Sequence, residues 1–144
     1  MNTYTELTCT DFSERLASRD AVPGGGGASA LTAALAAALS NMVGNLTVGK
    51  KKYADVEEEL RGLMERLDIL RRDLLELVEE DARSFEPLSR AYGLPKETEE
   101  ERQYKDTVME KCLLDAAQVP LEIMRKTAEI IPMARIFEIG RAHV

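Results

Sequence analysis

The 144-residue sequence has no tryptophan, one histidine and two cysteines, and these shortages exclude several classes of protein. Cys9 and Cys112 lack the paired spacing of a zinc site or a redox dithiol, and two isolated cysteines are typical of a reducing compartment. The first 20 residues are polar and lack the apolar core of a signal peptide. We therefore expect a cytoplasmic protein without a disulfide framework and without a bound metal.

Positive charge and long apolar runs are also scarce. Lys and Arg number 19 against 26 Asp and Glu, which gives a net charge of −7 and disfavours a nucleic-acid surface. The only candidate for a membrane span, residues 28–48, consists mainly of alanine and is interrupted by Asn41, Asn45 and several hydroxyl groups. This composition favours a buried helix, so we expect neither a nucleic-acid partner nor a membrane.

Helical patterns cover most of the sequence, and no segment alternates like a strand. Glycine and proline separate the patterns, which cover residues 7–17, 28–48 and 51–91, and a last stretch that starts at residue 98. Pro120 is expected to kink the last helix and Pro132 to end it. The predicted fold is all-α: long antiparallel helices in an up-and-down bundle that is incomplete at its C-terminal end.

An acidic residue stands in the apolar row of the third pattern. This row alternates spacings of four and three and consists of Val56, Leu60, Leu63, Leu67, Leu70, Leu74 and Leu77. The same alternation places Asp81 at the next inward position. Partial burial would raise its pKa toward a range useful for proton transfer, and Pro87 is expected to bend or open the helix just beyond it. The alternatives are an Asp paired with an arginine, or one turned toward solvent.

Glycines gather at the start of the alanine-rich pattern. Gly24, Gly25, Gly26 and Gly27 lead into a helix N-terminus, followed by Ser29. Exposed backbone N–H groups at the positive end of a helix dipole can bind a carboxylate, a phosphate or a developing negative charge. The alternative is a flexible turn between two helices.

Other candidate ligand contacts lie near the end of the same pattern. Lys50, Lys51 and Lys52 either offset the helix dipole or hold the glutamate tail of a ligand. Asn41 and Asn45 share one face of the helix and make either inter-helix contacts or ligand contacts.

An antiparallel arrangement separates these candidates. The alanine-rich helix spans about 30 Å, and the returning helix brings Asp81 to the end that carries the glycine run. The lysines then lie at the opposite end. An antiparallel two-fold dimer would bring one subunit's lysines toward its partner's glycines, so we expect active sites at a subunit interface.

Six segments form an ordered set of motifs: residues 22–30, 41–44, 46–53, 81–85, 94–95 and 119–121. Taken together and in this order, they resemble the cyclodeaminase/cyclohydrolase family, which comprises the C-terminal domain of formimidoyltransferase-cyclodeaminase and stand-alone bacterial relatives. The resemblance implies an all-α fold, a homodimer and a tetrahydrofolate derivative, possibly polyglutamylated, as the substrate. It implies no cofactor beyond that substrate, and it places the family's proposed catalytic aspartate on Asp81.

The implied reaction converts 5-formimidoyltetrahydrofolate to 5,10-methenyltetrahydrofolate and ammonia. The alternative within the family is a methenyltetrahydrofolate cyclohydrolase. A non-catalytic helical interaction module is the alternative of another class; it accounts for the leucines but has no use for Asp81 or for the glycine run.

The end of the sequence is expected to differ from the rest. Family members continue with further helices, so residues 1–137 are predicted to be a partial domain, inactive alone and prone to aggregate. Residues 138–144 can be encoded by a string that matches the start of a common sequencing adapter, and we predict a non-native tail there. The alternative is a chance polar tail. If the tail is not native, His143 is not part of the protein, and acid–base chemistry falls to carboxylates, Lys, Tyr or Cys.

Overall fold

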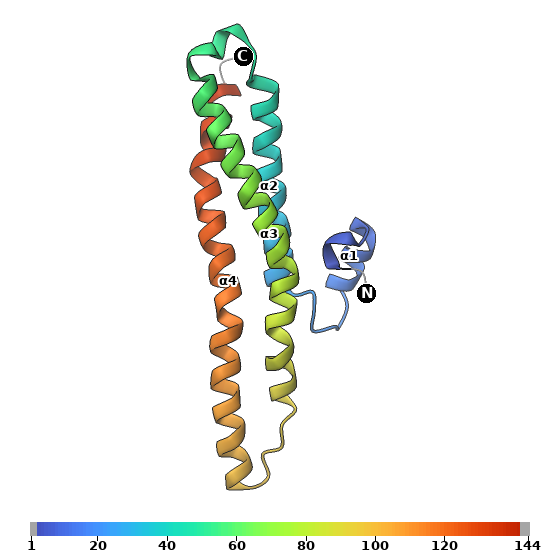
Figure 1. Cartoon of the computed structure of the whole chain (residues 1–144). Helices are drawn as coiled ribbons and strands as arrows, with labels where there is room; N and C mark the ends of the chain where they lie inside the picture. Colours follow the sequence, from blue (N-terminus) through green and yellow to red (C-terminus); the bar gives the residue numbers. More distant parts are fainter. Residues whose placement is uncertain (1–2, 142–144) are drawn as a thin grey trace.

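The computed structural model describes residues 3–141, with side chains described through Phe137, and these residues contain no strand. Within them, three long helices form an elongated up-down-up bundle (Figure 1). The helices are α2 (Gly25–Thr47), α3 (Glu57–Tyr92) and α4 (Glu99–Arg141). Helix α3 packs against both α2 and α4, and α2 also contacts α4. The all-α class and the antiparallel arrangement are therefore confirmed.

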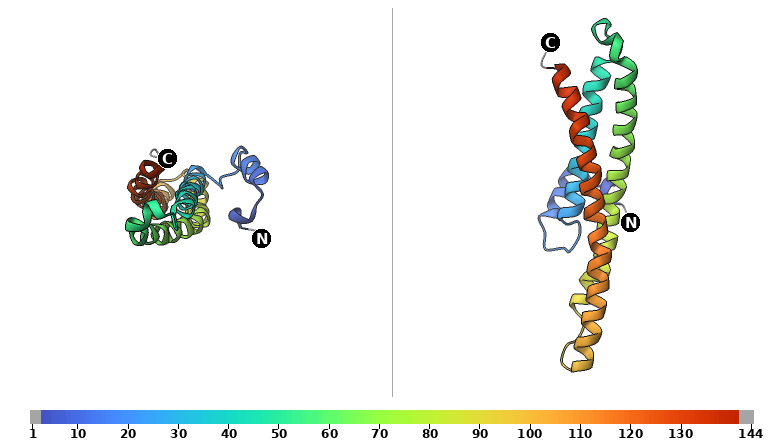
Figure 2. Two further views of the ribbon diagram at one scale, coloured as in Figure 1. Left: turned by 90° about the horizontal axis from the view of Figure 1, so that it is seen from above. Right: turned by 90° about the vertical axis from the view of Figure 1, so that its left-hand side faces the viewer.

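A short N-terminal segment lies beside the bundle. It contains the 3-10 turn η1 (Tyr4–Glu6) and helix α1 (Cys9–Leu16), and the view along the bundle shows it set off to one side (Figure 2). The backbone N–H of Thr5 donates a hydrogen bond to Glu79 Oε1 on α3 at 3.1 Å, and Phe12 is buried in the core. These contacts fasten the segment to the bundle.

Helix α2 begins at Gly25, three residues before the predicted start at Ala28. Gly25, Gly26 and Gly27 form the first turn of α2, while Gly24 is extended and precedes the helix. The N–H of Gly27 donates a hydrogen bond to Asp81 on α3. Gly49, with a φ of 83°, follows the end of the helix. A 3-10 turn, η2 (Lys51–Val56), connects α2 to α3.

The core forms where the alanines of α2 meet the leucines of α3. Ala30, Ala34 and Ala37 are buried on α2, opposite a fully buried row on α3 made of Leu67, Leu70, Leu74 and Val78. The buried row differs from the predicted apolar row at both ends, because Val56 is exposed and Val78 takes the place of Leu77 as the fully buried residue. A real helix drifts from a period of 3.5, so the buried face moves on to Ala82, and Asp81 lies at the margin of the core.

The prolines do not interrupt the helices. Helix α4 continues through Pro120 and Pro132 to Arg141, so the predicted end at Pro132 is wrong. Burial on either side explains the continuation, because Ile130 and Phe137 are each 3% exposed and their packing offsets the hydrogen bond that proline removes. Helix α3 likewise continues past Pro87 to Tyr92, so it does not open beyond Asp81.

Candidate functional site

The Asp81 side chain of α3 meets the first turn of α2. Gly24 precedes this turn and has no side chain to cap it, although the first amides of a helix lack partners within the helix. The N–H of Gly27 donates to Asp81 Oδ2 at 2.8 Å. A carboxyl group from another helix thus takes the place of a side-chain cap, and the expected proximity of Asp81 to the glycine run is found.

The carboxyl group of Asp81 occupies space that a side chain at position 26 would fill. A Cβ atom on Gly26 would lie 2.1 Å from Asp81 Oδ1 and 2.5 Å from its Cγ. A Cβ on Gly25 would meet nothing within 4 Å, and one on Gly27 would meet atoms only at ordinary contact distances of 3.5–3.8 Å. The glycine run therefore includes one position at which the backbone of α2 lies directly against the carboxyl group.

Burial governs the protonation of this group. Desolvation raises the pKa of Asp81 above its ordinary value, and the hydrogen bond from Gly27 opposes the rise. No ion pair to Asp81 occurs within residues 3–137, and the nearby Arg83 pairs instead with Glu80 at 2.6 Å. A partly buried carboxyl group with a raised pKa can donate and accept a proton under conditions in which an exposed Asp stays ionised.

Ser29 lies on the same turns of α2 but does not face Asp81. Its hydroxyl group donates to the carbonyl of Gly25 at 2.6 Å. Ser29 lines an open, mostly apolar groove of about 610 Å³ between α2 and α4, whose α4 side includes Met124 and Ile131. The groove begins next to the glycine run and could receive the apolar part of a ligand.

The structure does not bring the two asparagines to Asp81. Asn41 lies 14 residues after Gly27, about 21 Å along the helix. Asn41 and Asn45 line a separate groove with a set of α3 residues: Met64, Glu65, Asp68, Ile69 and Arg72. The oxygen Asn41 Oδ1 is buried and accepts no hydrogen bond within residues 3–137. The sequence reasoning missed these α3 residues, although the spacing of Asp68 and Arg72 indicated an ion pair on one face of a helix.

The lysines lie at the end of α2 remote from Asp81. Lys50, Lys51 and Lys52 are exposed at the start of η2, about 35 Å along the axis from Gly27. The Lys52 ammonium group lies 5.5 Å from the centre of the Tyr53 ring. The predicted separation of the lysines from the glycine run within one subunit is therefore found.

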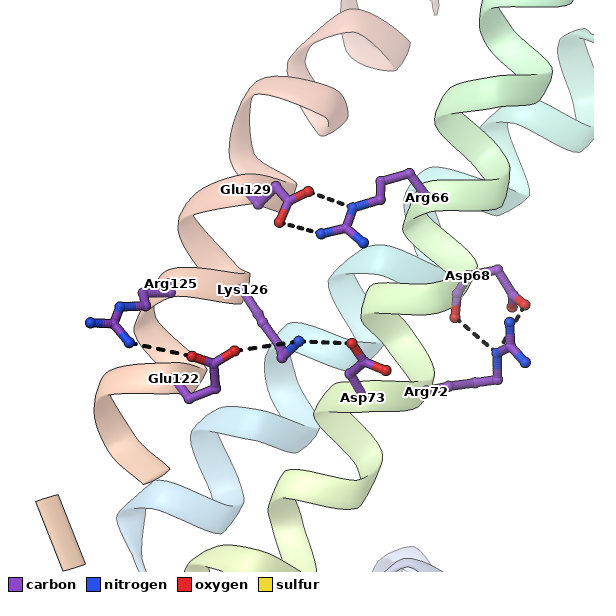
Figure 3. A network of polar contacts seen from close by, with 8 residues as sticks. All are labelled: Arg66, Asp68, Arg72, Asp73, Glu122, Arg125, Lys126 and Glu129. Atoms are coloured by element: carbon purple, nitrogen blue, oxygen red, sulfur yellow. Dashed lines mark hydrogen bonds and ion pairs between the residues drawn. The ribbon is translucent and has the colours of Figure 1, made fainter. Parts of the chain in front are cut away.

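An ion-pair network joins α3 to α4 (Figure 3). Lys126 of α4, whose side chain is 19% exposed, contacts Asp73 of α3 at 2.7 Å and Glu122 at 3.4 Å. Arg66 and Glu129 form a second bridge between the same helices. The carboxylate of Asp73 raises the pKa of Lys126 above its ordinary value. These pairs fix the register of α4 along α3. Of the contacts in the network, only the pair of Glu122 and Lys126, four residues apart on one helix, has a spacing that could be recognised from the sequence.

No group of three His, Cys, Asp or Glu side chains that could hold a metal ion is found in the described part of the chain. The two cysteines, Cys9 and Cys112, are both free and lie on different helices.

A family model described as formiminotransferase-cyclodeaminase matches residues 8–143. A methenyltetrahydrofolate cyclohydrolase from Methylorubrum extorquens is 43% identical over 129 residues, which cover 90% of this chain and 62% of the relative. A formimidoyltransferase-cyclodeaminase from Sus scrofa is 35% identical over 121 residues, which cover 84% of this chain and 22% of the relative. The chain thus spans less than two thirds of the length of these relatives.

A solved structure has the same fold. Formiminotetrahydrofolate cyclodeaminase from Thermotoga maritima superposes with a TM-score of 0.59 at 24% sequence identity. The match covers 96% of this chain and 79% of that one. At this level of identity the match shows a shared helical fold.

Proposed function

The chain belongs to the formiminotransferase-cyclodeaminase family, and from this premise we propose that it converts 5-formimidoyltetrahydrofolate to 5,10-methenyltetrahydrofolate and ammonia. The supporting observation is the Asp81 carboxyl group, which is desolvated, free of ion pairs among the described residues and bonded to the N–H of Gly27. The reaction forms one C–N bond, breaks another and moves protons, so the proposal includes no cofactor beyond the tetrahydrofolate derivative.

Asp81 serves as the proton carrier in this proposal. The N10 atom of the substrate attacks the carbon of the protonated formimidoyl group and forms a tetrahedral centre that carries an amino group. Asp81 takes the proton from N10 and delivers it to the amino nitrogen, which then leaves as ammonia. A raised pKa suits both steps because a general acid–base catalyst works best with a pKa close to the operating pH.

A second candidate is hydrolysis of the methenyl bridge. The 43% identity to a methenyltetrahydrofolate cyclohydrolase favours it. Water would attack the same carbon, Asp81 would accept the water proton, and one C–N bond would break to give a formyltetrahydrofolate. Both reactions pass through a tetrahedral carbon and need a proton carrier at the same place.

The test is an assay of both substrates with the longest open reading frame that contains this chain. Asp81→Asn keeps the size of the side chain and should lower kcat by about 10²–10⁴-fold, the usual contribution of general acid–base catalysis. Glu80→Gln is the matched control, since Glu80 is an exposed neighbour paired with Arg83. A wild-type rate for Asp81→Asn with both substrates would refute the proposed role, and no turnover of either substrate by the unaltered protein would refute the proposed function.

The same proposal includes a homodimer in the cytoplasm, formed through the α2 outer face, which consists of Leu35, Leu39, Met42 and Leu46. Each of these side chains is 46–59% exposed, and residues 25–47 contain no charge. Helix α2 is long and apolar enough to cross a membrane, and 33% of an 18-residue stretch of it is buried within the bundle. Core helices of soluble proteins can have the same length and composition, and we assign the α2 outer face to a second copy of the chain.

The spacing of the apolar residues on the α2 outer face supports a second copy of the chain as its partner. A two-fold axis midway between residues 40 and 41 pairs Leu35 with the partner's Leu46, and Leu39 with the partner's Met42. The face is thus complementary to itself in the antiparallel sense, as an isologous interface requires. The same register places Thr47, the last residue of α2, level with the partner's Ala34, so the lysines that follow lie toward the partner's glycine run. Each site would then combine Asp81 of one subunit with lysines of the other, which could hold a polyglutamate tail.

Two measurements test the dimer. Leu39→Glu should convert a dimer to a monomer in sedimentation analysis, whereas Leu114→Glu, at an exposed leucine of α4, should leave the dimer intact. An inactive Asp81→Asn protein mixed with a variant that lacks all three lysine charges should regain about a quarter of the wild-type activity, because half of the sites in mixed dimers are intact. A monomeric wild type, binding to lipid vesicles, or no recovery on mixing would contradict the shared site.

A further inference from the structure

The two oxygens of Asp81 differ in their surroundings. Oδ2 accepts the hydrogen bond from the N–H of Gly27 at 2.8 Å, while Oδ1 has no hydrogen-bond partner within residues 3–137. A hydrogen bond to a carboxylate oxygen stabilises its charged form, so a proton binds preferentially to the other oxygen. The structure therefore separates an anchored oxygen from an oxygen that can exchange a proton.

We propose that Gly26 is the positioning residue for Asp81: its missing side chain leaves the space in which Oδ1 carries the transferred proton while Oδ2 stays anchored on Gly27. The proposal rests on the proposed function and deepens it by assigning one task to each oxygen. Gly26 does not touch the reacting atoms of the substrate in this proposal; it acts through Asp81.

The need for glycine at position 26 is steric. A Cβ there would lie 2.1 Å from Oδ1 and 2.6 Å from Oδ2, far inside van der Waals contact. The backbone conformation at Gly26 does not demand glycine, because among the described residues φ is positive only at Gly49. Gly25 and Gly27 have room for a Cβ or nearly so. In the first turn of α2, the space that a side chain of Gly26 would take is thus occupied by the Asp81 carboxyl group.

The contact also accounts for the protonation behaviour of Asp81. A carboxylate at a helix N-terminus normally has a lowered pKa because the helix dipole and the amide N–H favour the charge. Here burial outweighs the hydrogen bond from Gly27. The backbone at Gly26 lies directly against the carboxyl group on one side. An added side chain must push the carboxyl group outward, which breaks the bond to Gly27 and returns the group to solvent.

The experiment is the variant Gly26→Ala, with Gly62→Ala as the matched control. Gly62 is an exposed helical glycine of α3 with no atom within 4 Å of its would-be Cβ, and it lies outside the proposed site. Displacing a catalytic group by about 1 Å can cost about 10²-fold in rate, so Gly26→Ala should lose about that factor in kcat with little change in KM. The acidic limb of its pH–rate profile should move to lower pH, and Asp81→Asn/Gly26→Ala should be no slower than Asp81→Asn.

A stability measurement keeps the test decisive if Gly26→Ala folds poorly. Asp81→Ala removes the three atoms that lie nearest to the new Cβ, namely Cγ and both carboxyl oxygens, so adding Gly26→Ala in that background should leave the melting temperature unchanged or higher. Kinetics of Gly26→Ala equal to those of Gly62→Ala, or an equal drop in melting temperature in both backgrounds, would overturn the positioning role. If Asp81→Asn itself kept the wild-type rate, the proposed function would fail instead.

Discussion

Gly44 is the point at which all three long helices approach closely, and substituting it measures how tightly they pack. Gly44 lies on α2. A Cβ at this position would lie 2.6 Å from Met64 Sδ on α3 and 3.1 Å from Phe137 Cε1 on α4. Gly44→Ala therefore introduces one methyl group between two neighbouring helices.

Two opposing effects set the magnitude. Alanine favours a helix over glycine by about 1 kcal/mol, whereas an extra methyl group in a packed core costs about 1–3 kcal/mol. Met64 is flexible and can move, but Phe137 is only 3% exposed and has little room. We expect Gly44→Ala to lower the free energy of unfolding by up to about 2 kcal/mol. Gly62→Ala has only the helix gain and should raise it by about 1 kcal/mol.

The assay is urea denaturation followed by circular dichroism on both variants. Equal stabilities of Gly44→Ala and Gly62→Ala would refute the close three-helix contact. A second comparison isolates α4: in a Phe137→Ala background, Gly44→Ala should cost clearly less than in the wild type. If the cost is unchanged, the segment of α4 beyond Pro132 does not pack against Gly44.

Three further predictions concern single groups. The folded-state pKa of Asp81 is raised above its ordinary value of 3.8, so the stability it contributes is present below that value and is lost as pH rises through the folded-state pKa. The stability of Asp81→Asn relative to the wild type should therefore grow with pH, and denaturation across a pH series measures this. Asp73→Asn should cost about 1 kcal/mol at neutral pH, discounted for the exposure of Asp73, because Lys126 keeps only Glu122 as a partner; urea titration measures the loss. Pro132→Ala should raise the melting temperature, since it restores a helical N–H within a continuous α4; an unchanged or lower value would argue for a break there.

The periodicity of the sequence predicted the long helices because each buries one continuous apolar row. It also predicted Asp81 beside the glycine run, since the length of α2 and the antiparallel return fix which ends meet. It failed at Pro132 because the cost of a proline in a helix depends on the burial on both sides, and the burial of Phe137 depends on contacts with α2. It also predicted Leu77 as the inward residue where the structure buries Val78. The prediction assumed a period of 3.5 residues, whereas a real helix has a period closer to 3.6.

The contribution of each candidate residue was harder to predict. The four glycines look alike in sequence, and only the position of the Asp81 oxygens separates Gly26 from its neighbours. The pairing of Asp73 with Lys126 joins residues 53 positions apart and requires the register of α3 on α4. The roles of the lysines and the asparagines stay predictions, as do the non-native tail at residues 138–144 and the partial domain at 1–137.

The absence of charge from α2 has a consequence for synthesis on the ribosome. Helix α2 is complete at Thr47, but its packing partner α3 ends only at Tyr92. At about 5–20 residues per second, about 45 further residues take roughly 2–9 s. During that interval a hydrophobic segment without charges awaits its partner, so a nascent-chain chaperone is expected to bind there first.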